Sequence, residues 1–165
     1  MRMRFGGYSA PAELDIVLAV GKNFDVDEAL PIYTSKIYVN DWVGFKYKYN
    51  NSGKCSHSID SDQTRKLLRE YSRAVLVIGK KTENFKEAVI SMEKELVKNG
   101  FYKALALING PCDLCQTTEN GSEAKHRPSL ELLGIDILAT VRKFKKNVEQ
   151  PKEGEMPPYA IILVE

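Results

Sequence analysis

Residues 74–108, AVLVIGKKTENFKEAVISMEKELVKNGFYKALALI, decide how this chain folds. Ala74–Gly79 is continuously apolar and rich in β-branched residues, which predicts a strand covered on both faces. Apolar residues then recur at helical spacing from Phe85 to Val97. Asn99-Gly100 follows this stripe, as is typical of the end of a helix.

The helix expected over Asn84–Asn99 has a possible capping box at its start, formed by Asn84 and Glu87. Tyr102–Ile108 (YKALALI) is the next predicted strand. The three elements make a β-α-β unit with short connections. We therefore expect the two strands to be parallel and the crossover to be right-handed.

The elements around this unit predict an α/β (α+β) fold with a mixed central sheet, in one domain over residues 1–165. Tyr159–Val164 (YAIILV) predicts another buried strand, and Ile135–Val148 predicts an amphipathic helix. Asp60-x-x-Gln63 resembles a capping box that starts a helix over about Ser61–Tyr71.

The N-terminal part predicts mainly strands, at Ala29–Tyr33, Lys36–Val39 and Trp42–Tyr49. Trp42–Tyr49 (WVGFKYKY) alternates aromatic or apolar residues with small or basic ones, the period of a half-buried strand. Ala12–Val20 fits a helix, and Ile16–Val20 within it fits a strand equally well. Aromatics interleaved with lysines could also stack on nucleic acid, but the overall charge disfavours that reading.

Composition narrows the class of protein. The 165 residues are 43% hydrophobic and 28% charged, with a net charge of +2, so nothing demands nucleic acid or an anionic membrane as partner. The longest apolar runs are far too short to span a bilayer. The basic, partly apolar N-terminus loosely imitates a signal peptide, but Glu13 and Asp15 interrupt it. We expect a cytoplasmic protein.

Most residues that could carry a chemical function lie in Asn109–Asp136, NGPCDLCQTTENGSEAKHRPSLELLGID. This stretch follows a predicted strand. Gly110-Pro111 forces a turn just before Cys112 and Cys115, and such a turn frees backbone N–H groups. Two thiolates at this Cys-x-x-Cys spacing can bind one metal ion or one edge of an iron–sulfur cluster.

Further ligands must come from elsewhere in the chain, and the available side chains are Cys55, His57 and His126. Cys55 with the Cys-x-x-Cys pair and one histidine would complete a tetrahedral Cys3His zinc site or hold a [4Fe–4S] cluster. Two alternatives stay open: an idle dithiol, and a thioredoxin-like redox pair. Thioredoxin-type pairs open a helix, and the polar run Gln116–Glu123 does not predict one.

Arg127, Ser129 and Glu131 are the other polar candidates. Ser129 after Pro128 can cap a short helix, with Glu131 supporting its first turn. Arg127 could instead hold an anion or brace a cluster, so Arg127 and Ser129 are our candidate cofactor-binding residues. The sequence has neither a glycine-rich phosphate loop nor a nucleophile elbow, and hydrolytic catalysis has no visible support.

These motifs resemble a known family. Gly110-Pro111-Cys112-x-Leu114-Cys115, then Arg127–Glu131 (RPSLE) and Gly134–Asp136 (GID), are similar to the second motif of the cysteine-rich "predicted metal-binding protein" family, domain of unknown function family 2284. Asp41–Val43, Gly53–Cys55 and Thr64–Tyr71 look like its first half. The resemblance runs from about Asp41 to the C-terminus, and it implies a class of site rather than a reaction.

The chain departs from the family pattern by lacking cysteines. Thr118 stands where a cysteine should follow Cys115, Leu133 stands at another cysteine position, and Phe45–Tyr49 offers none. The resemblance therefore supports metal ligation by Cys112 and Cys115, and less directly by Cys55. The expected function is metal or iron–sulfur binding, with an electron-transfer role that implies a redox partner protein. The alternatives are a scaffold or interaction module that has lost the metal site, and a small-molecule or anion-binding enzyme using the 109–131 loop.

Overall fold

The computed structural model describes residues 4–5, 8–9, 24, 26–50, 59–79, 84–110, 127–152 and 156–165. The predicted helix or strand within Ala12–Val20 lies outside these residues. The elements follow one another as β1 (Arg4–Phe5), β2 (Tyr8–Ser9), β3 (Glu28–Tyr33), the 3-10 helix η1 (Thr34–Lys36), α2 (Asp41–Asn50), α3 (Ser61–Arg69), β4 (Arg73–Ile78), α4 (Phe85–Lys98), β5 (Leu105–Ile108), α5 (Ile137–Phe144) and β6 (Tyr159–Leu163). Within the described residues, no helix is both long and apolar enough to cross a membrane.

The main sheet has four strands in the order β3-β4-β6-β5, and every neighbouring pair is antiparallel. Strands β4 and β5 both run antiparallel to β6, so they are parallel to each other as predicted, but β6 lies between them. The α+β class is confirmed, whereas the mixed pairing is corrected to antiparallel. The reason is that Tyr159–Leu163 is buried at every position and takes a central place in the sheet. The right-handed sense of the crossover stays a prediction.

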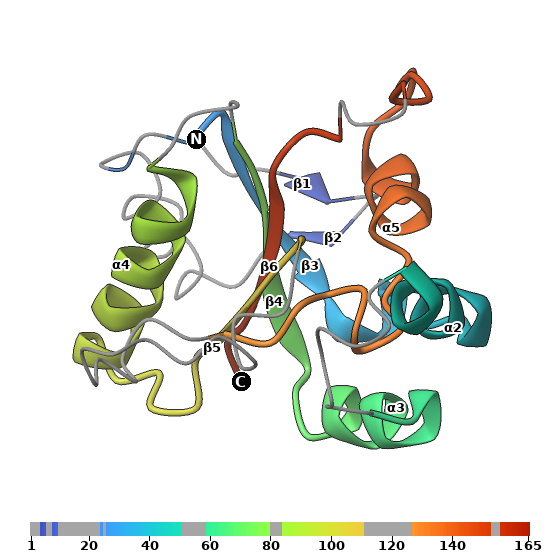
Figure 1. The fold of residues 1–165 in the computed structure, drawn as a ribbon. Helices are drawn as coiled ribbons and strands as arrows, with labels where there is room; N and C mark the ends of the chain where they lie inside the picture. Colours follow the sequence, from blue (N-terminus) through green and yellow to red (C-terminus); the bar gives the residue numbers. More distant parts are fainter. Residues whose placement is uncertain are drawn as a thin grey trace, which may run out of the picture.

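Both faces of the sheet are covered by helices. Helix α4 lies against one face, and α2, α3 and α5 lie on the other (Figure 1). Strand β4 supplies apolar side chains to both covered faces of the sheet. Ala74 and Leu76 belong to one apolar cluster, and Val75 and Val77 belong to another. All four side chains are fully buried, as the continuously apolar run predicts.

Residues 42–49 form a helix rather than the predicted strand. In α2 the buried residues are Val43, Gly44 and Tyr47, which is the spacing of one helical face. The exposed large side chains are Trp42, Phe45 and Tyr49. The alternation along the sequence therefore did not reflect burial. A Cβ added at Gly44 would lie 3.8 Å from the Gly134 Cα, which is ordinary van der Waals contact, so this face of α2 packs on the backbone at Gly134.

The two predicted capping boxes have different outcomes. At α3 the box is present: the Asp60 side chain accepts from the Asp62 N–H at 3.1 Å, and the Asp60 N–H donates to Gln63 Oε1 at 3.2 Å. At α4, Asn84 precedes the helix without a capping hydrogen bond from its side chain, so the second box is wrong. Asn84 has φ of −99° and ψ of 4° rather than the extended backbone of an N-cap.

The remaining corrections concern element boundaries. The predicted strand Lys36–Val39 is replaced by η1 and by an isolated bridge between Val39 and Ile135. Strand β5 begins at Leu105 because the chain turns through residues 102–103. Helix α5 begins after Asp136, whose side chain accepts from the Ala139 N–H at 3.0 Å, and it is shorter than predicted.

Candidate functional site

The structure brings together the two ends of the segment that carries the Cys-x-x-Cys pair. The Leu130 N–H donates to the Ile108 carbonyl at 3.1 Å, and the Ile108 N–H donates to the Pro128 carbonyl at 3.2 Å. These bonds form an isolated parallel bridge between Ile108 and Ser129. Residues 109–110 and 127–131 therefore lie side by side, and we call them the neck of the 111–126 segment.

Asn109, the first residue of the neck, is hydrogen-bonded to the chain at the start of β6. Its side-chain oxygen accepts from the Tyr159 N–H at 3.0 Å, and its amide nitrogen donates to the Pro157 carbonyl at 3.1 Å. Its backbone N–H also donates to the Tyr159 carbonyl at 3.0 Å. An asparagine presents both a donor and an acceptor, so this position satisfies the backbone next to the start of β6.

Gly110, Ser129 and Glu131 close the neck. The Gly110 N–H donates to Glu131 Oε2 at 3.1 Å, and Ser129 Oγ lies 2.8 Å from both the Gly110 carbonyl and Glu131 Oε2. Gly110 has φ of +115°, a conformation that favours glycine. Ser129 Oγ also accepts from the Leu132 N–H at 3.4 Å. The predicted capping role of Ser129 is therefore present, in a short turn rather than a helix.

Arg127 is held by Glu93, a contact that the sequence patterns did not reveal. Arg127 Nε lies 2.8 Å from Glu93 Oε2, and Nη2 lies 2.6 Å from Oε1, so the pair is bidentate. The side chains are only 13% and 10% exposed. Glu93 Oε2 also accepts from the Ala106 N–H at 2.6 Å. The pair thus ties α4, β5 and the neck together, and it speaks against Arg127 holding an external anion.

One sequence signal could have identified Glu93. It lies in the middle of the buried stripe of α4, among Val89, Met92 and Leu96. A carboxylate at such a position needs a cationic or hydrogen-bonding partner, because burying an unpaired charge is costly. The sequence offered several arginines, and only the fold identifies Arg127 as the partner.

Glu131 is the carboxylate with a perturbed environment at the neck. Burial raises its pKa above the ordinary value of 4.5, and hydrogen bonds from its own backbone, Ser129 and Gly110 partly oppose that shift. Desolvation disfavours the ionised form, while donors to the carboxylate favour it. The carboxyl group of Glu131 is thus a structural acceptor whose charge state depends on its burial and on these hydrogen bonds.

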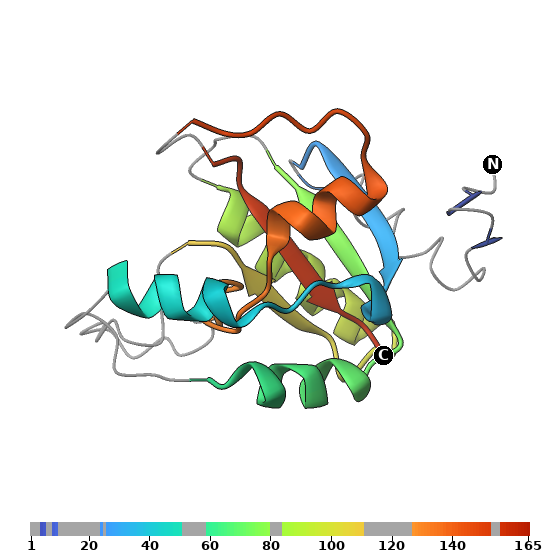
Figure 2. The same cartoon turned by 90° about the vertical axis from the view of Figure 1, so that its right-hand side faces the viewer.

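The segment that carries Cys55 meets the body of the protein near the same place. Tyr47 and Leu132 form a small buried cluster, and Ile59 packs against it. Tyr47 lies near the end of α2, Ile59 follows the 51–58 segment, and Leu132 follows the neck. The end of α2 and the carboxyl end of β5 lie toward the same side of the molecule (Figure 2). Ile59, which follows the Cys55 segment, is therefore a neighbour of Leu132, which follows the neck.

All five predicted metal ligands lie outside the described residues: Cys55, His57, Cys112, Cys115 and His126. In the part of the chain that the structure describes, no group of three or more His, Cys, Asp or Glu side chains could hold a metal ion. Ligation by these five residues stays a prediction. The cofactor-binding role of Arg127 and Ser129 also stays a prediction, although both now have structural partners.

Comparison with known proteins gives one match. A family model described as "Predicted metal-binding protein (DUF2284)" matches residues 31–164. No curated protein and no solved structure matches the chain significantly. The match covers the whole main sheet apart from the first residues of β3, and it includes both cysteine-bearing segments.

Proposed function

This chain belongs to the DUF2284 family of predicted metal-binding proteins, and we propose that it binds one metal ion or iron–sulfur cluster through Cys112, Cys115 and Cys55. The observation that carries the proposal is the Tyr47–Ile59–Leu132 cluster, because it places Ile59, which follows the Cys55 segment, against Leu132, which follows the neck of the Cys-x-x-Cys segment. His57 and His126 are the candidates for a fourth ligand.

The residues present fit such a group chemically. Three thiolates with one imidazole are a common ligand set for zinc, and thiolates also bind the iron of clusters. Cys112 lies two residues beyond Gly110, and Cys55 lies four residues before Ile59. At about 3.5 Å per extended residue, these tethers reach roughly 7 and 14 Å from their described ends. Such lengths are compatible with a shared site next to the neck.

The neck would fix the direction in which the Cys-x-x-Cys segment leaves the sheet. The Glu93–Arg127 pair and the Ser129 hydroxyl hold its two ends together through hydrogen bonds. A cluster would supply one-electron transfer to a redox partner protein, whereas zinc would supply structural stabilisation. The role proposed for Arg127 and Ser129 is therefore to position the ligand segment.

Metal analysis of the protein purified without oxygen tests the proposal. We expect either about one zinc ion or up to about four iron atoms with matching sulfide per chain. Cys112→Ser with Cys115→Ser should remove the metal, and Cys55→Ser should lower its occupancy. Thr118→Ser changes a neighbouring residue without removing a thiol, so it is the matched control and should retain the metal. Absence of both zinc and iron at near-stoichiometric level would overturn the proposal.

The second candidate is a protein-interaction scaffold without a metal. The observation that favours it is that Gly110, Arg127 and Ser129 all have partners within the polypeptide itself. These motif residues can thus be explained without any bound group. If this candidate is right, Cys112→Ser with Cys115→Ser will leave the free energy of unfolding unchanged in the presence and absence of a strong chelator.

A further inference from the structure

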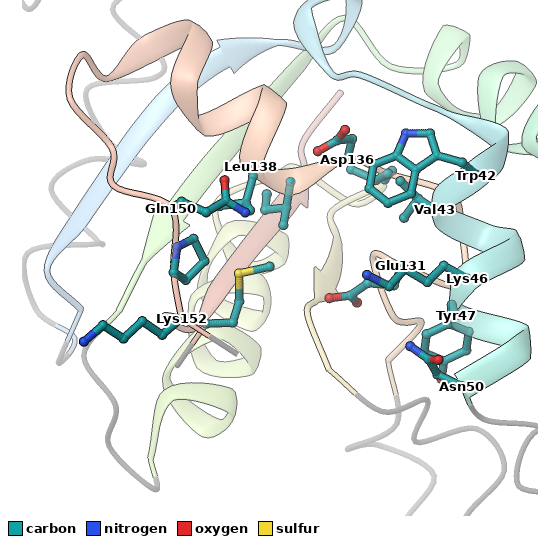
Figure 3. A pocket seen from close by; sticks show the side chains of 14 residues that line it. Trp42, Val43, Lys46, Tyr47, Asn50, Glu131, Asp136, Leu138, Gln150 and Lys152 are labelled. Carbon is teal, nitrogen blue, oxygen red and sulfur yellow. The ribbon is translucent and has the colours of Figure 1, made fainter. Parts of the chain in front are cut away.

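A cleft beside the neck belongs to neither of these proposals. It lies between α2, the 131–138 segment, residues 150–152 and Met156, with a volume of about 400 Å³ (Figure 3). The residues that line it are Trp42, Val43, Lys46, Tyr47, Asn50, Glu131, Ile135, Asp136, Ile137, Leu138, Gln150, Pro151, Lys152 and Met156. Its size lies in the range of small-molecule sites, and a mostly apolar lining with a few polar groups is typical of them.

The carboxylates of the cleft already have partners. Asp136 accepts from the Ala139 N–H at 3.0 Å and from Asn40 Nδ2 at 3.2 Å. Glu131 accepts from Gly110 and Ser129 at the neck. Both carboxylates are therefore already hydrogen-bonded within the chain.

Lys46 is the cation that points into the cleft. Its side chain extends from α2 over the cleft toward Glu131, whereas Lys152 extends away from it (Figure 3). Within the described part of the chain, no carboxylate lies within ion-pair distance of the Lys46 ammonium. Trp42 lies above Lys46 on the same wall, and Leu138 comes from α5 (Figure 3). The cleft thus combines one available positive charge with an indole ring and aliphatic side chains.

We propose that this cleft binds a small organic anion with a flat apolar body, such as an aromatic carboxylate or sulfonate. The anionic group pairs with the Lys46 ammonium, and the apolar body lies among Trp42, Leu138 and Met156. Indole provides a stacking face for a flat ring, and burial of apolar surface provides most of the affinity. Burial also raises the pKa of Glu131, which reduces the repulsion of an anion as the pH falls.

The test uses the fluorescent probe 8-anilinonaphthalene-1-sulfonate and its uncharged analogue N-phenyl-1-naphthylamine. Trp42 is the single tryptophan of the chain, so quenching of its emission reports on probe bound near this indole. We expect the sulfonate to saturate one site and to quench Trp42 over the same concentration range. Lys46→Gln should weaken sulfonate binding about fivefold and change binding of the neutral analogue less than twofold.

Two further variants complete the test. Lys46→Arg keeps the positive charge and should bind the sulfonate within about twofold of the unmodified protein. Lys66→Gln removes an exposed lysine of α3 that does not line the cleft, and it should change neither probe. Each of the following results would overturn the proposal: sulfonate binding that does not saturate, an unquenched Trp42, or an equal effect of Lys46→Gln on both probes.

Discussion

The two segments that carry the three cysteines are attached to the sheet in different ways. The ends of 111–126 are joined by hydrogen bonds and a buried ion pair, made by Asn109, Gly110, Arg127, Ser129 and their partners. The described ends of 51–58 are joined instead by apolar packing of Tyr47 and Ile59 on Leu132, next to the cap of α3.

The difference concerns how strictly each attachment specifies residue types. Hydrogen bonds and ion pairs require particular donors and acceptors in a fixed geometry, whereas apolar contacts tolerate exchange between side chains of similar volume. The Gly-Pro-Cys-x-Leu-Cys and Arg-Pro-Ser motifs surround the polar attachment. Gly110, Arg127 and Ser129 are thus explained by the structure of the neck, so their presence does not by itself require a metal.

The largest expected effect comes from breaking the polar attachment. Glu93→Leu removes the acceptor shared by the Arg127 guanidinium and the Ala106 N–H, so the buried Arg127 loses its bidentate carboxylate. Loss of one member of a buried pair costs about 3–5 kcal/mol. We expect a decrease of that size in the free energy of unfolding, measured by urea denaturation.

The double variant Glu93→Leu with Arg127→Met is the control for this prediction. It removes both charges, so most of the lost stability should return. If the neck also positions the cysteines, the double variant should fold yet bind metal less tightly than the unmodified protein. Equal instability of the single and double variants would show that the ion pair itself is not what stabilises the neck.

The next effect comes from the apolar attachment. Leu132 is fully buried, and Leu132→Ala should lower the free energy of unfolding by about 2–5 kcal/mol through lost contacts and a cavity. Val97→Ala, at a 44% exposed position on α4, should change stability by less than about 0.5 kcal/mol. Thermal and urea unfolding of both variants measure the difference. A small effect at Leu132 would mean that this cluster does not fix the 51–58 segment.

The sequence predicted the elements of the fold where one physical signal dominated. Ala74–Gly79 and Tyr159–Val164 are apolar at every position, so only central strands accommodate them. Trp42–Tyr49 misled because Phe45 and Tyr49, which belong to the alternating pattern, remain exposed, whereas Val43 and Tyr47 are buried at helical spacing. The pairing of the sheet depends on where β6 inserts, and no local pattern contains that information.

Only the motif residues of the candidate site were predictable from the sequence, and their arrangement in space was not. Motif spacing identified Gly110, Arg127 and Ser129, and the structure gives each a partner. Glu93, the partner of Arg127, lies in α4, and Asn109 bonds to the backbone next to the start of β6, so the roles of these two residues require the tertiary fold. The proximity of Ile59 to Leu132 is equally non-local, and it is the feature that links Cys55 to the other cysteines.

A smaller effect on stability is expected at Asp60, the N-cap of α3, which follows the 51–58 segment. Asp60→Ala removes the acceptor for the Asp62 N–H and should lower the free energy of unfolding by about 1 kcal/mol. Asn84→Ala is the matched variant at α4, where the side chain makes no capping hydrogen bond, and it should have almost no effect. Urea denaturation of the two variants tests this contrast, and equal losses would contradict the assignment of the caps.

The smallest effect, and the most specific to the neck, is a change in how stability depends on pH. The pKa of Glu131 is raised in the folded protein, so between pH 4.5 and that higher pKa the folded state binds more protons than the unfolded state. Stability from this group therefore falls as the pH rises through that interval. Glu131→Gln should abolish this contribution, so the variant gains stability relative to the unmodified protein from acidic to neutral pH.

Ser129→Ala provides the opposite change at the same carboxyl group. The Ser129 hydroxyl lowers the pKa of Glu131 by hydrogen bonding, so its removal should raise that pKa further and extend the pH interval over which stability falls. Urea denaturation at several pH values between 4 and 8 measures both slopes. Parallel curves for all three proteins would mean that the charge of Glu131 is not coupled to the neck, and the polar attachment would then rest on the Glu93–Arg127 pair and on the hydrogen bonds of Asn109.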